Sequence, residues 1–474
     1  MAERAGAGPG AVASVRADSE PAVSPDSGPI EATPSITDWP RFVLALVVVA
    51  VAAAGFAIAF RGTLAAMGRW LGGASDVVDM IRHVPLWARV VMPAGGGLAA
   101  GLISMRASKQ RGVGGVGGVM EAVVLGRPSL SVRRTLLQSA ASWCAIATGN
   151  SLGREGPLIQ FGAAAGEAAR RAFKLRTAPG RAVIAAGVAA GFAAAYNTPF
   201  AAVLFVVEIV TGVVVMEAVV PVLIATVIAT VLTRAAIGAG PIYGARGFAL
   251  VAPAELAAFV GLGVFAGLVG VGFLRALSAG ERGWDKLPRP WRNACGGLVA
   301  GAILVALPEV AGNGYEPLDA LLDGKLAVGL VAWLVIAKPA ATIASVGSGN
   351  PGGVFTPTLL IGGCAGALYG AGLHAVLGDA AIGSVGGYAL VGLAAALAAT
   401  THAPLTAAVM AFELSGDYAI VLPLVIATAT AAALARRLQR DSVYTAELAR
   451  RGLSWTMSLD GRRIVEERKP GGLQ

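Results

Sequence analysis

A glutamate lies inside a glycine-rich phrase that the chain contains twice. The phrase GNSLGREGP spans residues 149–157, and GNPGGVFTP follows at residues 349–357. Each phrase places glycines, a short polar turn and a proline before an apolar run, a pattern typical of a helix start. Helix N-termini carry partial positive charge and free N–H donors. Two such ends directed at one point would bind an anion weakly enough to release it, as permeation requires.

Glu155 stands in the first phrase, and Phe355 takes its place in the second. A carboxylate among anion-binding donors would compete with a permeating anion and would leave when protonated. We therefore interpret Glu155 as a gate, a proton carrier or both, because ionisable groups inside a membrane usually serve function. The alternative is structural, with Glu155 pairing with Arg154 or capping a helix.

The elements that position these phrases also repeat. The first copy matches the second at a constant offset that becomes slightly larger downstream, so that Gly187, Pro199 and Glu208 match Gly392, Pro404 and Glu413. Two related halves in one chain are typical of transporters and channels that hold their site at the repeat interface. Because Glu208 has a counterpart in Glu413, we interpret it as structural.

The composition predicts a membrane protein. Hydrophobic residues make up 56% of the chain and charged residues 14%, whereas soluble domains average about 25% charged residues. Runs such as 42–60 and 256–274 approach the roughly 20 apolar residues that cross a bilayer. The 65 glycines favour close helix packing. We expect an all-α polytopic protein that contacts membrane lipids.

The basic residues gather at segment ends, where they set orientation in the membrane. The net charge of +9 is thus explained without nucleic acid, and both termini are predicted to be cytoplasmic. Three cysteines lacking CxxC spacing and three separated histidines suggest neither disulfides nor a metal site. No cofactor is expected.

The chain divides into four predicted parts. Residues 1–38 are rich in Ala, Pro, Ser, Gly and Asp and should form a disordered tail. Residues 39–245 and 246–440 are the two halves, and a polar stretch at 279–292 interrupts the apolar sequence near its middle. Residues 441–474 are expected to form a cytoplasmic helix and tail.

Together, GREGP at 153–157, GGVFTP at 352–357, NTPFAAVLFVVE at 197–208 and Tyr444 in DSVYTAELA resemble the CLC family of chloride channels and proton-coupled anion transporters. The resemblance covers roughly residues 40–450. It implies an inverted-repeat helical bundle with many tilted, partial-length helices. It also implies a homodimer with one pore per subunit, in the inner membrane of a bacterium.

The resemblance further implies roles for individual residues. Glu155 takes the place of the gating glutamate, and its neighbours Gly153, Arg154 and Gly156 complete the first anion-binding segment. The N–H groups of Val354 and Phe355 resemble anion ligands. Tyr444 resembles the inner tyrosine whose hydroxyl contacts the central ion, although an interfacial aromatic is the alternative.

Three departures from the family pattern qualify these roles. The first signature, GSGIP, is degenerate, because Val113 or Gly114 stands where its serine should be. This loss leaves the preferred anion open, with chloride, nitrate and fluoride as candidates. Ile209 follows Glu208 where coupled exchangers often carry a second glutamate, so the internal proton site is lost. We expect no counterpart of the regulatory nucleotide-binding CBS pair that many eukaryotic members carry after the membrane part.

We therefore predict channel-like or weakly proton-coupled movement of chloride-like anions, controlled by Glu155. A strictly coupled exchanger of protons with chloride or another anion is the alternative. A cation-coupled carrier of an organic solute would need a larger site and cation-coordinating groups, which the motifs do not supply. An enzyme would need a nucleophile with a base or a metal cluster, and no catalytic residue is assigned.

Overall fold

The computed structural model describes residues 39–467, apart from 75, 111–113, 126–129, 213–215, 239, 241–242, 245–246, 249, 379–381, 451 and 459–460. The predicted disordered tail at 1–38 lies outside the described residues. The elements of the first half are α1 (Trp39–Gly72), α2 (Val77–His83), α3 (Leu86–Ser108), α4 (Gly115–Leu125), α5 (Val132–Ala147), α6 (Glu155–Ala172), α7 (Thr177–Tyr196), α8 (Pro199–Phe205), the π-helical turn η1 (Val206–Thr211) and α9 (Met216–Ile237).

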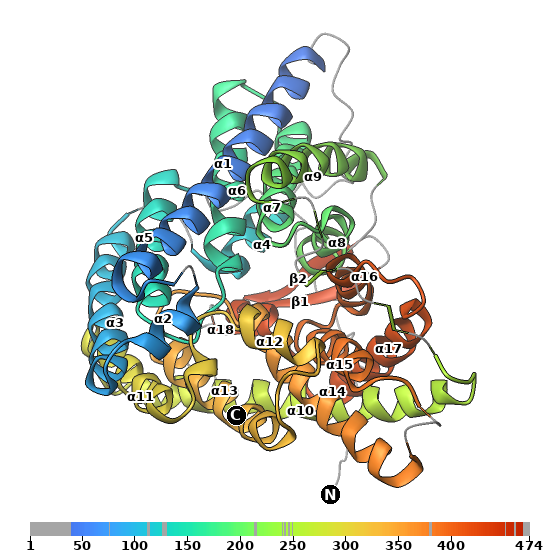
Figure 1. Cartoon of the computed structure of the whole chain (residues 1–474). Coiled ribbons are helices and arrows are strands. Elements are labelled where there is room, and N and C mark those ends of the chain that lie inside the picture. Colours follow the sequence, from blue (N-terminus) through green and yellow to red (C-terminus); the bar gives the residue numbers. More distant parts are fainter. Residues whose placement is uncertain are drawn as a thin grey trace, which may run out of the picture.

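The remaining elements begin with α10 and end in a short hairpin. They are α10 (Glu255–Trp284), α11 (Trp291–Ala306), the 3₁₀ turn η2 (Pro308–Val310), α12 (Tyr315–Leu322), α13 (Val328–Gly347), α14 (Phe355–Leu377), α15 (Val385–Thr401), α16 (Pro404–Ser415), α17 (Val421–Leu438), α18 (Val443–Arg450), β1 (Leu453–Ser458) and β2 (Gly461–Glu467). The first half lies in the upper part of Figure 1 and the second in the lower part, with α18 and the hairpin between them.

The architecture is helical, as predicted. Among the described residues, eight helices are long and apolar enough to span a membrane, while others such as α15 and α16 are shorter. Large apolar side chains also remain exposed along the outer faces of α1, α9 and α10, where lipid would cover them. The protein is an integral, multi-pass membrane protein.

The C-terminal segment differs in part from the prediction of a helix and tail. The helix is present as α18, but β1 and β2 then pair antiparallel, with Ser458 opposite Gly461 and an irregularity between Ser454 and Trp455. The Asp-Gly pair at 460–461 is a hairpin signal that the sequence analysis passed over.

Corresponding helices of the two halves begin and end alike. α6 starts at Glu155 and α14 at Phe355, each at the seventh residue of its glycine phrase. α7 and α15 both end at a left-handed residue, Asn197 and His402, each with φ of 59°. α8 and α16 then begin with Pro199 and Pro404. The repeat read from the sequence is therefore a repeat of local backbone structure.

Close helix packing joins the halves at α3 and α11. A Cβ added to Gly97 would strike the backbone carbonyl of Asn293, and one added to Gly297 would strike that of Pro93. Only glycine permits this approach. The side-chain amides of Asn150 and Asn350 donate to the same two carbonyls, of Pro93 at 2.9 Å and of Asn293 at 3.2 Å.

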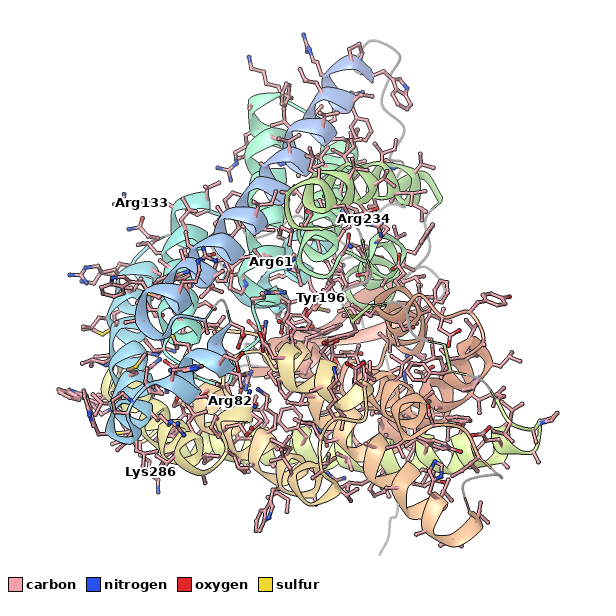
Figure 2. All side chains as sticks on the ribbon, viewed as in Figure 1. Arg61, Arg82, Arg133, Tyr196, Arg234 and Lys286 are labelled. Carbon is pink, nitrogen blue, oxygen red and sulfur yellow. The ribbon has the colours of Figure 1, made fainter. Side chains whose placement is uncertain are left out.

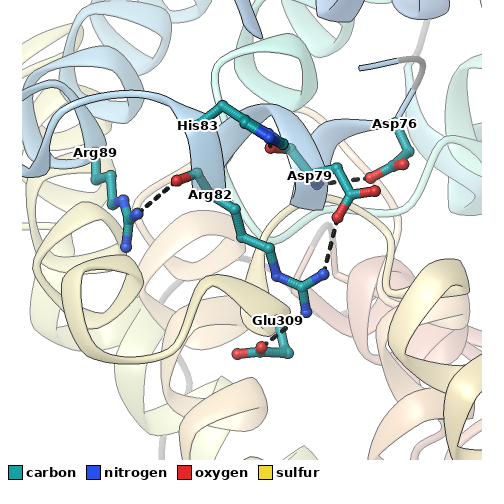
Figure 3. A network of polar contacts seen from close by, with 6 residues as sticks. All are labelled: Asp76, Asp79, Arg82, His83, Arg89 and Glu309. Atoms are coloured by element: carbon teal, nitrogen blue, oxygen red, sulfur yellow. Dashed lines mark hydrogen bonds and ion pairs between the residues drawn. The ribbon is translucent and has the colours of Figure 1, made fainter. Parts of the chain in front are cut away.

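A polar network fixes α2 against the second half (Figure 3). Asp76 caps α2 by accepting from the N–H of Asp79 at 2.7 Å. Arg82 then donates to Asp79 at 2.8 Å and to Glu309 of η2 at 2.9 Å, while Arg89 donates to the carbonyl of Arg82 at 2.8 Å. The contact between Arg82 and Glu309 connects segments more than two hundred residues apart.

Two glutamates cap helices across the halves. Glu413 of α16 accepts from the N–H groups of Phe200 (3.0 Å) and Ala201 (2.7 Å), at the start of α8. Glu208 of η1 accepts from the N–H groups of Leu405 (3.1 Å) and Thr406 (2.6 Å), at the start of α16. Each carboxylate thus satisfies N–H groups that have no partner within their own helix. These contacts support the structural interpretation of Glu208.

We predict that Glu413→Ala destabilises the protein by about 1–3 kcal/mol, because the two N–H donors at the start of α8 lose their acceptor. Thermal unfolding of the purified protein in detergent measures the change. Asp285→Asn is the control, since Asp285 is 72% exposed and pairs only with Arg292, a surface interaction worth about 0–1 kcal/mol. Equal effects of the two variants would contradict the capping role.

Candidate anion site

The two glycine phrases meet in the interior of the molecule. Gly153 and Gly353 form an isolated antiparallel bridge, in which the N–H of Gly153 donates to the carbonyl of Gly353 at 2.7 Å. The N–H of Gly353 returns a bond to the carbonyl of Gly153 at 2.9 Å. This pairing places the N-terminus of α6 beside that of α14, because both helices start two residues after the bridge.

Glu155 reaches across this bridge to the second helix start. Its side chain is 1% exposed. One carboxylate oxygen accepts from the N–H of Phe355 at 2.9 Å, and the other accepts from the hydroxyl of Thr356 at 2.9 Å. The glutamate of the first phrase thus occupies donors of the second. A carboxylate there is stabilised by the N-terminal end of the α14 dipole.

A second residue holds the hydroxyl of Thr356 in place. Tyr196 Oη lies 3.0 Å from Thr356 Oγ1. Because the single hydroxyl hydrogen of Thr356 is used toward Glu155, the tyrosine is the donor of the second bond. Figure 2 shows Tyr196 where the two halves of the molecule meet. Sequence reasoning missed Thr356 and Tyr196, since neither side chain carries a distinctive spacing.

An aromatic cluster surrounds Phe355. Its ring centroid lies 5.4 Å from that of Tyr196, 5.5 Å from that of Phe192 and 6.5 Å from that of Phe205. The ring of Tyr444 meets Phe205 edge-on at 5.9 Å. These rings form an apolar wall that restricts water around the Glu155 carboxylate and strengthens its few polar contacts.

Arg154 does not neutralise Glu155. Its guanidinium lies over the ring of Tyr315, 4.6 Å from the centroid, and the described contacts of Glu155 include no ion pair with Arg154. The alternative of a simple Arg154–Glu155 pair is therefore not what the structure contains. Capping remains part of the description, but the capped helix is α14 rather than the helix that carries the glutamate.

A cavity of about 350 Å³ approaches the bridge from the side of α18. We call it the inner cavity. Its lining includes Gly156, Gly353, Val354 and Tyr444, of which Tyr444 is 7% exposed. Five of the predicted anion-binding residues, Gly153, Glu155, Gly156, Val354 and Phe355, therefore gather at the bridge, with Tyr444 beside them.

Two of the three departures from the family pattern concern single residues, Val113 or Gly114 in the first signature and Ile209 in η1. Val113 is outside the described residues, whereas Gly114 directly precedes α4. Ile209 is 2% exposed within η1, so an apolar side chain fills that position. Among the described residues, no group of three or more His, Cys, Asp or Glu side chains could hold a metal ion.

Comparison with known proteins identifies the family. A family model described as "Voltage gated chloride channel" matches residues 96–436. A putative chloride channel protein ClcB-like from Ralstonia nicotianae is 40% identical over 402 residues, which is 83% of this chain and 93% of that protein. The voltage-gated ClC-type chloride channel ClcB of Escherichia coli O81 is 35% identical, covering 86% and 99% of the two chains.

Solved structures share the fold. A slow cyanobacterial Cl⁻/H⁺ antiporter matches with a TM-score of 0.78 and 24% identity, and a CLC-type fluoride/proton antiporter with 0.70 and 20%. Each comparison covers 87% of this chain and 98% of the other. With the paired helix starts and the family match over most of the membrane part, the chain belongs to the CLC family of chloride channels and antiporters.

Proposed function

We propose that this protein moves chloride-like anions through a pore that Glu155 closes. The observation that carries the proposal is the position of its carboxylate, which takes the N–H of Phe355 and the hydroxyl of Thr356. A permeating anion needs the N–H donor of Phe355. The permeating anion and the carboxylate of Glu155 therefore compete for this donor. Protonation removes the negative charge of the carboxylate and so weakens its binding relative to that of the anion.

The pore is complete within one chain, because Gly153 and Gly353 of the same subunit form the bridge. The inner cavity gives access from one side, while the buried Glu155 closes the way to the other. Backbone N–H groups of Gly156 and Val354 and the hydroxyl of Tyr444 are the further groups we assign to the anion path, and Gly153 positions them through the bridge to Gly353. Arg154, held over Tyr315, contributes positive charge near this path rather than a direct ligand.

We further propose channel-like or weakly proton-coupled transport. The apolar Ile209 and the use of Glu208 as a helix cap leave η1 without a carboxylate free to carry protons. The protein acts in this proposal as a transporter and not as an enzyme. It lies in the inner membrane of a bacterium with both termini in the cytoplasm, and it requires no cofactor.

The central test measures anion and proton movement together in liposomes holding the purified protein. Chloride flux is expected without a fixed proton stoichiometry, and Glu155→Gln should raise flux at neutral pH and weaken its pH dependence, because the charge that competes at the start of α14 is gone. Glu167→Gln is the control on the same helix, where Glu167 pairs with Arg170 at 2.7 Å; this variant should keep the wild-type pH dependence.

Three outcomes decide between the possibilities. A fixed ratio of protons to chloride would establish strict exchange instead of weak coupling. Passage of nitrate or fluoride in place of chloride would reassign the preferred ion, which the degenerate first signature leaves undetermined. Absence of any small-anion flux from both wild type and Glu155→Gln would overturn the proposed function.

We predict that Thr356→Val raises chloride flux at neutral pH by roughly 3- to 10-fold, because the carboxylate of Glu155 loses one hydrogen bond that holds it in the pore. Thr358→Val is a matched control two residues further along α14, since the hydroxyl of Thr358 donates to the carbonyl of Val354 at 2.8 Å. The same liposome assay compares them. A similar change in both variants, or a loss of flux in Thr356→Val alone, would contradict this role.

We also propose a homodimer. Large apolar side chains remain exposed on α8, α9, α16 and α17, among them Phe200 at 60% and Leu422 at 61%. The helix caps that Glu208 and Glu413 form across the halves, here called the cross-caps, hold α8 and α16 side by side. Two copies of this apolar surface would bury it against each other. Light scattering of the purified protein in detergent should give twice the mass of one chain, and the mass of a single chain would refute the dimer.

A further inference from the structure

A second carboxylate lies at the inner cavity, which also borders the proposed anion path. Glu447 of α18 lines this cavity together with Tyr444, three residues earlier on the same helix. One oxygen of the Glu447 carboxylate accepts from the N–H of Gly117 at 3.1 Å, in the first turn of α4. This helix start follows the degenerate first signature.

The glycines of α4 make room for this carboxylate. A Cβ on Gly115 would collide with an oxygen of Glu447, and a Cβ on Gly117 would stand 3.0 Å from its Cδ. Gly115 also has φ of +79°, which side chains other than glycine rarely adopt. The departure of residues 114–117 from the family pattern is therefore matched by a glutamate that fills the resulting space.

A buried donor beside α4 points to an anion at the same place. Gln160 of α6 is 5% exposed, and its Oε1 accepts from the N–H of Gly115 at 3.4 Å. Its Nε2 is buried without a hydrogen-bond partner and lies 3.4 Å from the position of a Cβ on Gly114. An unused N–H donor beside a helix N-terminus is suited to an anion that enters the inner cavity.

We propose that Glu447 is an inner gate, a tethered carboxylate that competes with chloride-like anions for the N-terminus of α4 and the amide of Gln160. This inference rests on the proposed function and extends it to the opposite end of the path. Glu155 and Glu447 then act alike, because each carboxylate comes from one helix and occupies the N-terminus of another. An anion must displace both to cross.

Other charged groups also lie near Glu447 among the described residues. Arg450 of α18 forms an ion pair with Glu281 of α10 at the rim of the cavity, and Arg134 of α5 lies close to Gly114. Tyr444 is the remaining titratable group of α18 that lines the cavity. Among the elements that pack on α18, α4 carries Glu121, α15 carries Tyr388, and β1 carries no titratable residue.

The test uses the full-length protein in liposomes with equal pH on both sides, so that its orientation does not matter. In the Glu155→Gln background, where the outer carboxylate is removed, chloride flux should rise at least about fivefold from about pH 7 to about pH 5, as the inner carboxylate becomes protonated. In the Glu155→Gln, Glu447→Gln double variant, flux should be high at both values and the rise should disappear.

Two controls separate gating from capping. Glutamine keeps an oxygen that can accept from the N–H of Gly117, so the Glu447→Gln protein should have the melting temperature of the wild type. If Glu447 were only a helix cap, the chloride flux of Glu447→Gln would also be unchanged. Glu281→Gln removes a charge from the same cavity without touching α4, and in the Glu155→Gln background it should keep the pH response. Retention of that response in the Glu447→Gln double variant would overturn the inner gate.

The same experiment distinguishes the two proposals. If all variants pass no anions, the proposed function fails and the inner gate fails with it. If Glu155→Gln passes anions but neither pH nor Glu447→Gln changes the flux, the inner gate alone is refuted. Isothermal titration of the purified proteins with chloride gives a second readout, in which Glu447→Gln should bind at least about fivefold more tightly.

Discussion

The structure depends on the bridge between Gly153 and Gly353. Two backbone hydrogen bonds of 2.7 and 2.9 Å bring two helix N-termini together in the membrane interior, where unpaired N–H groups would otherwise be costly. Those N–H groups create a site that favours negative charge without burying a lysine or arginine in it. The carboxylate of Glu155 satisfies them when no other anion does. In the proposed function, stability of the closed state and selectivity for anions thus have the same origin.

Symmetry explains why the charge stands in only one phrase. The bridge brings Glu155 and Phe355 into equivalent positions at the starts of α6 and α14. Two carboxylates, one at the start of each of these adjacent helices, would repel each other in a low-dielectric environment. The two residues have different roles. The carboxylate of Glu155 accepts hydrogen bonds at the start of α14, whereas the ring of Phe355 packs among Phe192, Tyr196 and Phe205.

Sequence reasoning reached the helical membrane fold, the repeat and the central position of Glu155, because glycine, proline and charge inside apolar sequence follow strict local rules. It did not reach Thr356, Tyr196 or Glu447. Their roles arise from contacts between residues far apart in the chain, such as the bond from Gly117 to Glu447, and no local spacing marks them. The hairpin β1–β2 was missed for a different reason, because its Asp-Gly turn signal lies in the segment that was predicted to be a tail.

The cross-caps of Glu208 and Glu413 have a consequence for how the chain is assembled. α8 receives its cap from a residue synthesised about two hundred positions later, so its first turn stays unsatisfied until the second half has entered the membrane. The start of α14 is the opposite case, because its acceptor Glu155 is synthesised before the N–H donor of Phe355. The first half is therefore incomplete as an independent folding unit, because the first turn of α8 lacks its acceptor until α16 packs beside it.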